Sequence, residues 1–469
     1  MTITTRPRTI GELRASEYKV LSVKEEMRKN LIQKIRAGED LFPGIVGYEE
    51  TVIPQIENAI LSGQDIIFLG ERGQAKTRMA RSLANLLDDE VPMIAGCEIN
   101  DSPYEPICRA CCDKVAAQGD NVEIAWLPRD RRYGEKLATP DITISDLIGE
   151  VDPVRVAEGR YLSDELTIHY GMIPRTNRGI FCINELPDLA ERIQVGLLNI
   201  MEERDVQIRG YKIRLPLDVY VVASANPEDY TNRGRIITPL KDRVGSEIRT
   251  HYPYVLEHEI TIMDAESTHF DSDGLDVVFP QFMKEVIAQV THLARKSNDI
   301  SQRSGVSVRV SISNYENVLS NALRRALRLK ERQIAPRISD LSAIMASTCG
   351  KIELDAVGDI KEDRVVQKLI NTAITTVFGE YFETREFDQL VAGFERGLNV
   401  QVGDELSSME YVNQLARVGG LSKAVDKLDA RKGGPASIAS AVEFILEGLH
   451  LNRRLNKDQV NGKVHYRRN

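Results

Sequence analysis

The residue types that bind a triphosphate occur together in one short loop. The loop reads Gly70-Glu71-Arg72-Gly73-Gln74-Ala75-Lys76-Thr77, and Arg78 follows in an expected helix. Glycines let backbone N–H groups turn toward phosphate oxygens, and the start of the helix adds more of them. Lys76 would reach the β- and γ-phosphates, and the Thr77 hydroxyl would ligate Mg²⁺. The pattern therefore predicts a nucleoside triphosphate site, although a glycine-rich turn with a surface lysine would look similar.

Ala75 is a departure from the usual phosphate-loop pattern G-x-x-x-x-G-K-[ST], which has glycine at this position. Alanine adds only a methyl group, so we expect it to be harmless if the backbone φ angle is negative there. The loop is therefore still predicted to bind its nucleotide.

A polar pair that could catalyse hydrolysis follows an apolar run, since Asn184 and Glu185 come directly after 179–183. Phosphate-loop ATPases usually have Asp-Glu here. The Asp holds the water shell of Mg²⁺, and the Glu orients and deprotonates the attacking water. Asn184 can accept a hydrogen bond from a metal-bound water but brings no charge, so we expect weaker Mg²⁺ binding, with Asp188 supplying some of the missing charge. Alternatively, Glu185 only begins the next helix.

Asn226 ends a further apolar run and precedes Pro227. At the tip of a strand beside the phosphate loop, its amide would position the attacking water or contact the γ-phosphate. An ordinary Asn-Pro turn is the simpler alternative.

The elements that must position these residues are predicted from the flanking sequence. Three short runs, 65–69, 179–183 and 219–223, are apolar on both faces and bounded by turn residues, which is typical of parallel strands covered by helices. A helix is predicted at 189–203 and a β-hairpin at 206–214. The polar stretch 101–178 is too long for a plain loop, so we predict an insertion there.

Helical periodicity dominates the two ends of the chain. Leu21, Met27, Leu31 and Ile35 indicate an amphipathic N-terminal helix. Helices are also predicted at 280–298, 313–330, 338–350, 363–380 and 408–428. We therefore predict four parts: a helical arm (1–40), an αβα domain with a parallel sheet (41–255), a helical lid (256–400), and a helical C-terminal region (401–469). The last 20 residues hold six Lys/Arg and one Asp, and we expect a solvated basic tail, or one that contacts an acidic partner or nucleic acid.

Composition excludes several classes of protein. With 42% hydrophobic and 28% charged residues, the chain is typical of soluble globular proteins. We expect no membrane span, because no apolar run approaches about 18 residues. The first residues lack the apolar core of a signal peptide, and six cysteines do not suggest a disulfide scaffold, so we expect a cytoplasmic protein. A net charge of −9 argues against nucleic acid as a partner.

In this order, the phosphate loop and the strands ending in Glu185 and Asn226 resemble those of the AAA+ ATPases. Other segments resemble the branch that contains the magnesium chelatase small ATPase subunit and the MoxR-type ATPases. Ile45 and Val46, followed by Gly47, resemble the segment that holds adenine in this family. Further resemblances are the run into the acidic strand (171–180), an inserted helix and hairpin region (146–149 with 159–161), and the hairpin at 206–214. Together they cover roughly residues 40–330.

The resemblance also implies roles for two arginines. The segment 239–245 is similar to the family's Leu-Leu-Asp-Arg-Phe run, which makes Arg243 the arginine finger that acts on the γ-phosphate of a neighbouring subunit. Arg233 and Arg235 are the alternatives, and a surface ion pair is the simpler role for Arg243. The segment 305–309 resembles the one that carries the sensor 2 arginine, which would be Arg309, or this residue is purely structural. The helix after it is expected to have Ser313 as its cap, with Glu316 at the third position.

As a member of this family, the chain would bind ATP and Mg²⁺ between the subunits of a homo-oligomeric ring, expected to be a hexamer. Hydrolysis would change the angle between the domains and remodel a client protein, together with a von Willebrand A-type domain protein. Other functions stay open. One is the ATPase subunit of magnesium chelatase, which inserts Mg²⁺ into protoporphyrin. Another is a nucleotide-binding scaffold with little hydrolysis. A third, a DNA-associated transcriptional activator, lacks its Gly-Ala-Phe-Thr-Gly-Ala loop here.

Four cysteines lie near one another in the sequence: Cys97, Cys108, Cys111 and Cys112. Thiolates at such spacing bind Zn²⁺ tetrahedrally. However, adjacent Cys111 and Cys112 make awkward joint ligands, and the second half of a paired C-x-x-C knuckle is absent. Unliganded thiols are therefore the favoured expectation, with a zinc site as the alternative. The histidines show no spacing typical of a catalytic zinc site.

Overall fold

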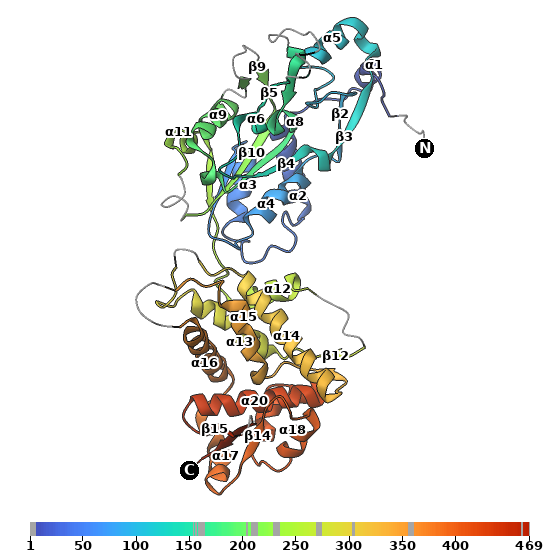
Figure 1. The fold of residues 1–469 in the computed structure, drawn as a ribbon. Coiled ribbons are helices and arrows are strands. Elements are labelled where there is room, and N and C mark those ends of the chain that lie inside the picture. Colours follow the sequence, from blue (N-terminus) through green and yellow to red (C-terminus); the bar gives the residue numbers. More distant parts are fainter. Residues whose placement is uncertain are drawn as a thin grey trace, which may run out of the picture. The chain divides into compact units, whose positions relative to one another are not determined.

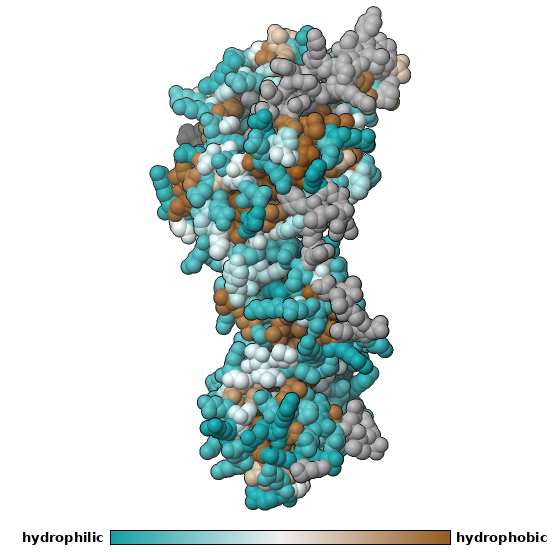
Figure 2. Space-filling view, turned by 90° about the vertical axis from the view of Figure 1, so that its left-hand side faces the viewer, coloured by the Kyte–Doolittle hydropathy of each residue, from teal (hydrophilic) through white to brown (hydrophobic). Residues whose placement is uncertain are grey.

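The computed structural model describes residues 6–152, 154, 157, 165–202, 205–207, 214–227, 235–268, 274–302, 305–354, 361–460 and 463–468. The chain divides into two compact units, Met1–His251 and Tyr252–Asn469 (Figure 1). Within these ranges, no helix combines the length and apolarity that crossing a membrane requires. Hydrophilic residues predominate on the face drawn in Figure 2, with hydrophobic residues in groups between them.

A five-stranded parallel sheet forms the centre of the N-terminal unit. Its order is β11 (Ser246–Arg249), β1 (Ile66–Leu69), β10 (Val219–Ala225), β7 (Gly179–Asn184) and β4 (Tyr133–Leu137). Every residue of β1, β10 and β7 is buried, which is why these strands read as apolar on both faces. The three predicted strands and the parallel sheet are confirmed.

Helices cover both faces of this sheet. One hydrophobic cluster joins Ile66 and Phe68 to α2 (Val23–Ala37), α3 (Ile53–Leu61) and α4 (Lys76–Ser82). A second cluster joins Ile67 and Leu69 to α6 (Ile144–Leu147), α8 (Met172–Arg175), α9 (Glu191–Glu202) and α11 (Thr238–Arg243). Successive side chains of β1 therefore enter opposite layers, and the predicted three-layer αβα architecture is confirmed (Figure 1).

The stretch 101–178, predicted as one insertion, contains the sheet strand β4, and to that extent the prediction was wrong. β4 pairs with β7 in parallel, with Glu135 opposite Cys182. Its sequence, Tyr-Gly-Glu-Lys-Leu, has little apolar character because it lies at the sheet edge and is only half-buried. The same stretch holds α5 (Arg109–Gln118), β3 (Ile124–Pro128), β5 (Gly149–Val151) and β6 (Ile168–Tyr170). β3 pairs with β2 (Glu90–Ile94), and β5 pairs with β6.

The N-terminal arm packs onto this unit as two helices. The short α1 (Ile10–Ala15) lies against 119–124: Ile10 N–H donates to the Val122 carbonyl at 3.0 Å. Ser22 caps the start of α2. Within this helix, the Glu26 carboxylate accepts hydrogen bonds from both terminal guanidinium nitrogens of Arg132, at 2.7 and 2.5 Å. This ion pair is almost fully buried and ties α2 to the start of β4.

The hairpin predicted at 206–214 is confirmed at its base, where β8 (Asp205–Gln207) pairs antiparallel with β9 (Arg214–Pro216). Its tip at 208–213 lies outside the described residues, as do the predicted features at 159–161 and Arg233.

The C-terminal unit is mainly helical, as predicted. Its α-helices are α12 (Leu256–Glu266), α13 (Gln281–Ala294), α14 (Arg309–Leu329), α15 (Ile344–Thr348), α16 (Glu362–Tyr381), α17 (Asp388–Glu395), α18 (Ser408–Leu415), α19 (Leu421–Lys427) and α20 (Gly434–Leu451). The start of α14 differs from prediction: Ser313 lies inside the helix, which begins at Arg309. The N-cap residue is Val308, which makes no side-chain cap hydrogen bond, while the Ser307 hydroxyl accepts the Arg309 N–H at 3.2 Å.

The basic tail is not a solvated end in this structure. β15 (Asn456–Val460) and β16 (Lys463–Arg467) form an antiparallel sheet with β14 (Val400–Val402). Lys457 donates to both carboxylate oxygens of Glu447 in α20, at 2.8 and 3.0 Å, and the Tyr466 hydroxyl also donates to Glu447. A buried glutamate therefore absorbs one of the tail's positive charges, and the expectation of a solvated tail was wrong.

Candidate active site

The phosphate loop connects β1 to α4, and its backbone conformation requires unusual residues. Gly70 lies so close to the Thr250 hydroxyl and the Gln74 side chain that any Cβ atom would collide with them. Gly73 has φ +77°, which glycine adopts without strain. Ala75 has φ +56°, so the condition under which alanine is harmless is not met. The methyl group is held in the left-handed region at a cost of about 1–2 kcal/mol.

A chain of hydrogen bonds joins the ends of β1, β10 and β7. The Lys76 ammonium donates to Oδ1 of Asn226 at 2.7 Å, and Nδ2 of Asn226 donates to Oε2 of Glu185 at 2.9 Å. Lys76 also donates to the carbonyl of Glu71 at 2.9 Å and to that of Gly70. Because β10 lies between β1 and β7, its terminal asparagine contacts both the loop lysine and the glutamate. The three predicted residues are thus brought together at one sheet edge.

Asn184 and Thr77 meet on the other side of the loop. Oδ1 of Asn184 accepts the Ser224 hydroxyl at 3.2 Å and the Thr77 hydroxyl at 3.5 Å. The backbone N–H of Glu185, a residue at φ +56°, donates to the same Ser224 hydroxyl at 3.3 Å. The two predicted Mg²⁺ contacts, Thr77 and Asn184, are therefore adjacent.

Glu135 is a carboxylate at this site that the sequence did not reveal. Its Oε1 accepts a hydrogen bond from Nδ2 of Asn184 at 2.7 Å. The Arg81 guanidinium donates hydrogen bonds to both carboxylate oxygens of Glu135, at 2.7 and 2.9 Å. The hydrogen bond to Glu135 raises the pKa of Arg81, while burial raises the pKa of nearby Cys182 to about 12 and keeps that thiol neutral. Glu135 thus places negative charge near Asn184, and the expected contribution of Asp188 stays a prediction. No sequence signal marked Glu135, because β4 was read as part of an insertion.

The remaining predicted nucleotide contacts surround the loop. Ile45 is buried in the core beneath α4 and Val46 is half-buried, while the Arg78 guanidinium lies against Gly44 in the same turn. Gln74 is held inside the loop, because its Oε1 accepts the Glu71 N–H at 3.0 Å and the Thr250 hydroxyl at 2.6 Å. A cavity of about 360 Å³ opens beside Gly70, Glu71 and Gln74, and Lys241 and Arg249 are among its lining residues. Arg72 and Gly73 complete the predicted loop.

The predicted arginine roles fall on exposed residues. Arg243 is the last residue of α11 and is exposed, and Arg235 is also exposed, 4.0 Å from Glu191. Arg309 begins α14 in the C-terminal unit, where it is exposed. The described contacts therefore assemble Lys76, Thr77, Asn184, Glu185 and Asn226, and leave the two arginine roles as predictions.

This arrangement is that of a P-loop nucleotide-binding protein. A strand, a phosphate loop and a helix supply backbone N–H groups and a lysine, and the neighbouring strand ends supply a polar asparagine and a carboxylate. Glu185 is within one hydrogen bond of Asn226, and Asn226 within one of Lys76. The Asn226 amide therefore connects the lysine of the loop to the carboxylate of Glu185.

Comparison with known proteins narrows this class. Residues 157–244, under a fifth of the chain, match the family model of the sigma-54 interaction domain. Magnesium-chelatase subunit ChlI from Nostoc sp. is 27% identical over 263 residues, 54% of this chain and 64% of that protein. A ChlI homolog from Methanocaldococcus jannaschii is 28% identical over 216 residues, 44% of this chain and 53% of that protein. The chain is similar to the ChlI subunit of magnesium chelatase, and its parallel sheet and phosphate loop fit the P-loop αβα fold of AAA+ proteins.

These likenesses are partial. The chain spans about 64% of the Nostoc subunit's length and 53% of the archaeal homolog's. Among solved structures, NtrX from Brucella abortus is 14% identical with a TM-score of 0.40, covering 74% of this chain and 67% of that chain. The fold assignment therefore depends on the chain's own sheet order and phosphate loop.

Proposed function

We propose that this chain binds ATP with Mg²⁺ at the phosphate loop and hydrolyses it at the interfaces of a homo-oligomeric ring. The observation that carries the proposal is the hydrogen-bonded chain from Lys76 through Asn226 to Glu185. Lys76 binds the β- and γ-phosphates, Asn226 positions the attacking water and Glu185 accepts its proton. The expected ligands of the nucleotide also include Ile45, Val46, the loop residues 70–78 and Arg309.

Thr77 and Asn184 hold the Mg²⁺ ion and its water shell in this proposal. Asn184 brings no charge, but Glu135 lies one hydrogen bond away, and its charge is shared with Arg81. Mg²⁺ is therefore expected to bind mainly with the nucleotide, whose phosphates supply the remaining negative charge. ATP supplies the phosphoryl bond that is cleaved, and the protein supplies position and proton transfer.

Arg243 is proposed to act in trans on the γ-phosphate bound by the neighbouring subunit. Its exposure at the end of α11 supports this role, because a residue that reaches another protomer must lie at the surface. A hexamer is the proposed ring. Its use would be mechanical: hydrolysis would remodel a client protein, in the manner proposed for MoxR-type chaperones, with a von Willebrand A-type domain protein as the partner.

The test compares steady-state ATP turnover of the wild type with Glu185→Gln and Arg243→Ala. Each variant is expected to lose at least 100-fold in turnover while keeping its affinity for a fluorescent ATP analogue. Mixing the two variants should restore part of the turnover, because a mixed ring contains interfaces with an intact Glu185 on one side and an intact Arg243 on the other. Arg235→Ala is the matched control and should retain turnover.

Turnover that is unaffected by Glu185→Gln would contradict the proposal and favour the nucleotide-binding scaffold. Turnover lost in Arg235→Ala and kept in Arg243→Ala would transfer the finger role to Arg235. An added von Willebrand A-type protein should raise turnover; if none does, the partner proposal fails while the ATPase proposal stands.

A second candidate is the ATPase subunit of magnesium chelatase, favoured by the ChlI likeness. The chain would then replace ChlI in a reconstituted chelatase and support the fluorescence rise of Mg-protoporphyrin. An active ATPase that gives no such rise excludes this candidate.

A further inference from the structure

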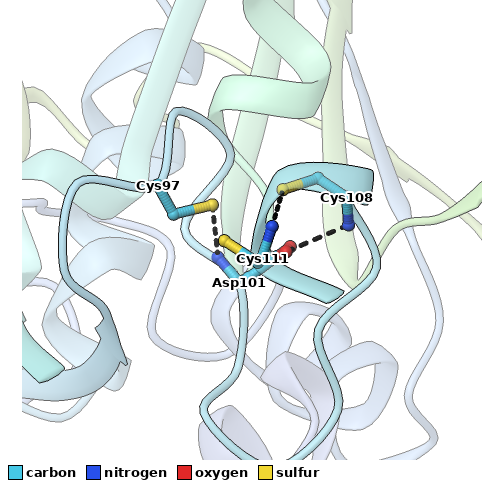
Figure 3. Close-up of side chains that lie close together, drawn as sticks. All are labelled: Cys97, Asp101, Cys108 and Cys111. Atoms are coloured by element: carbon cyan, nitrogen blue, oxygen red, sulfur yellow. Dashed lines mark hydrogen bonds between the residues drawn. The ribbon is translucent and has the colours of Figure 1, made fainter. Parts of the chain in front are cut away.

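Away from the phosphate loop, four side chains with metal-binding groups meet at the start of α5. Cys97 follows β2, Cys108 is the N-terminal cap of α5, Cys111 lies in its first turn, and Asp101 comes from the loop between them (Figure 3). Their sulfur atoms and a carboxylate oxygen all lie within 4.8 Å of one another. Figure 3 shows the three thiols pointing toward one another.

The fold changes the ligand set that the sequence suggested. Cys112 is exposed, and its thiol donates to the Pro106 carbonyl at 3.3 Å, so it does not join the cluster. Asp101 takes the fourth position. The main objection to a metal site, two adjacent cysteines on one ion, is therefore removed.

Asp101 is fully buried, and its two oxygens have different surroundings. Oδ2 accepts the N–H groups of Cys108 at 3.0 Å and Ile107 at 3.2 Å. Oδ1 has no hydrogen-bond partner among the residues that the structure describes. Burying a carboxylate oxygen without a partner is costly, and a bound cation would satisfy it. The two backbone N–H groups fix the carboxylate so that Oδ1 is the oxygen available to a cation.

Two of the sulfur atoms are also held as acceptors. The Asp101 N–H points at Sγ of Cys97 at 3.3 Å, and the Cys111 N–H points at Sγ of Cys108 at 3.4 Å. Such N–H groups orient a ligating sulfur and stabilise its negative charge.

We propose that Cys97, Asp101, Cys108 and Cys111 bind one structural Zn²⁺ ion in tetrahedral geometry. A Zn–S distance of about 2.3 Å places tetrahedral sulfur atoms about 3.8 Å apart. The present separations exceed this by about 1 Å at most, which side-chain rotation can close. All four positions are filled by protein atoms, which is the pattern of a structural site and not of a catalytic one. A carboxylate beside three thiolates suits Zn²⁺ better than Cu(I), which prefers soft ligands alone.

The ion has an entry path. A cavity of about 210 Å³ reaches Cys97, Cys108 and Cys111, and Lys114 lines it and donates to the Ala95 carbonyl at 3.0 Å. Zinc binding displaces the protons of the ligating thiols. The site closes the chain between residues 97 and 111 and fixes α5 against the end of β2, next to the residues on which α1 packs. It is independent of the nucleotide site, so its test does not depend on ATP turnover.

The test is metal analysis of the full-length chain purified without chelators. We expect about one zinc per chain by plasma mass spectrometry. Cys97→Ser and Cys108→Ser should reduce zinc at least fivefold, whereas Cys112→Ser, the matched control one residue from a ligand, should retain it. Because a ligand variant could fail to fold, a second measurement uses the wild-type chain. Zinc is removed with a chelator under reducing conditions and replaced by Co²⁺, which should give the near-ultraviolet sulfur-to-cobalt charge-transfer band of a thiolate-rich tetrahedral site.

Three outcomes would overturn the proposal. The wild type could contain less than a tenth of an equivalent of zinc and give no Co²⁺ band. Cys112→Ser could lose zinc as completely as Cys108→Ser. The purified chain could contain iron with acid-labile sulfide, or carry a disulfide among these cysteines by intact mass, in either of which cases zinc is not the group that these residues serve.

Discussion

Asn184→Asp restores the acidic residue that most phosphate-loop ATPases have, and the structure makes its effect two-sided. In the wild type, Nδ2 of Asn184 donates to Oε1 of Glu135 at 2.7 Å. The aspartate has no such donor, so the substitution removes this bond and places two carboxylates side by side. Without nucleotide we expect the variant to be less stable than the wild type, and with Mg²⁺ and nucleotide we expect it to bind Mg²⁺ more tightly.

The size of the stability loss expected for Asn184→Asp follows from the contacts of residue 184. A hydrogen bond to a charged group contributes about 1.5–3 kcal/mol. Two carboxylates that relax to about 4 Å repel by about 4 kcal/mol at an effective dielectric constant near 20. Arg81, bound to both oxygens of Glu135, cancels a large part of that repulsion. The net loss in the free energy of unfolding is therefore expected to be about 2–4 kcal/mol, or a shift of roughly 1 M in the urea midpoint.

Trp126 makes the measurement specific to the N-terminal unit. It is the single tryptophan of the chain, it lies in β3, and its indole N–H donates to the Pro7 carbonyl at 3.1 Å. Urea unfolding followed by its fluorescence should show the loss for Asn184→Asp at pH 8. The loss should shrink as the pH falls below about 5, because the crowded carboxylates raise the folded-state pKa of the new aspartate and the repulsion disappears once one carboxylate is protonated.

Glu135→Gln supplies the control through a double-mutant cycle. In the Asn184→Asp background it removes the repulsion, so the two substitutions should couple by more than 1 kcal/mol. Equal urea midpoints for the wild type and Asn184→Asp without Mg²⁺, together with additive effects of the two substitutions, would refute the contact between residues 184 and 135.

Two further substitutions test single features of the units. Ala75→Gly should raise the free energy of unfolding by about 0.5–1 kcal/mol in the same Trp126 assay, because glycine relieves the strain at φ +56°; a variant less stable than the wild type would show that this φ angle is not positive in solution. In the C-terminal unit, burial acts to raise the pKa of Glu259, but the nearby His292, the charge and hydrogen bonds of Arg295 and the hydrogen bond from Ser311 outweigh it and lower that pKa. The stability that Glu259 contributes is therefore present above its unfolded pKa near 4.5 and is lost as the pH falls. Glu259→Gln should accordingly lower the melting temperature by circular dichroism more at pH 7 than at pH 4, and an equal effect at both values would contradict it.

The residues that carry the proposed chemistry were predictable because each follows a strand that is buried on both faces. Such strands read as short apolar runs, and polar residues at their carboxyl ends meet at one edge of the sheet. Lys76, Glu185 and Asn226 were found in this way without knowing the strand order. The order explains why the hydrogen-bonded chain exists, since β10 lies between β1 and β7. The periodicity of a single strand does not reveal the order of the strands in the sheet.

Helix α20 was missed because it is buried almost all round. Residues 436–449 are all buried, so the helix has no polar face and no amphipathic period to detect. Its two acidic side chains, Glu443 and Glu447, accept hydrogen bonds from Tyr411 and Tyr466. The basic tail was misjudged for the same reason, because the residue that pairs with Lys457 belongs to a helix that the sequence did not reveal.

Glu135 and Asp101 were overlooked in the sequence for a common reason. Sequence spacing pairs residues that are near one another in the chain, but the partner of Asn184 comes from 49 residues away, across an edge strand with little apolar character. In the cluster, the sequence offered Cys112 as the fourth, awkward member beside Cys111, whereas Cys112 is exposed in the structure and Asp101 lies with the other three cysteines. In both sites the residue that the sequence did not reveal is a carboxylate. Glu135 lies beside Arg81 and the Asn184 amide, and Asp101 lies beside three thiols. A polar residue in an unassigned segment should therefore be weighed as a possible ligand before the segment is read as a loop.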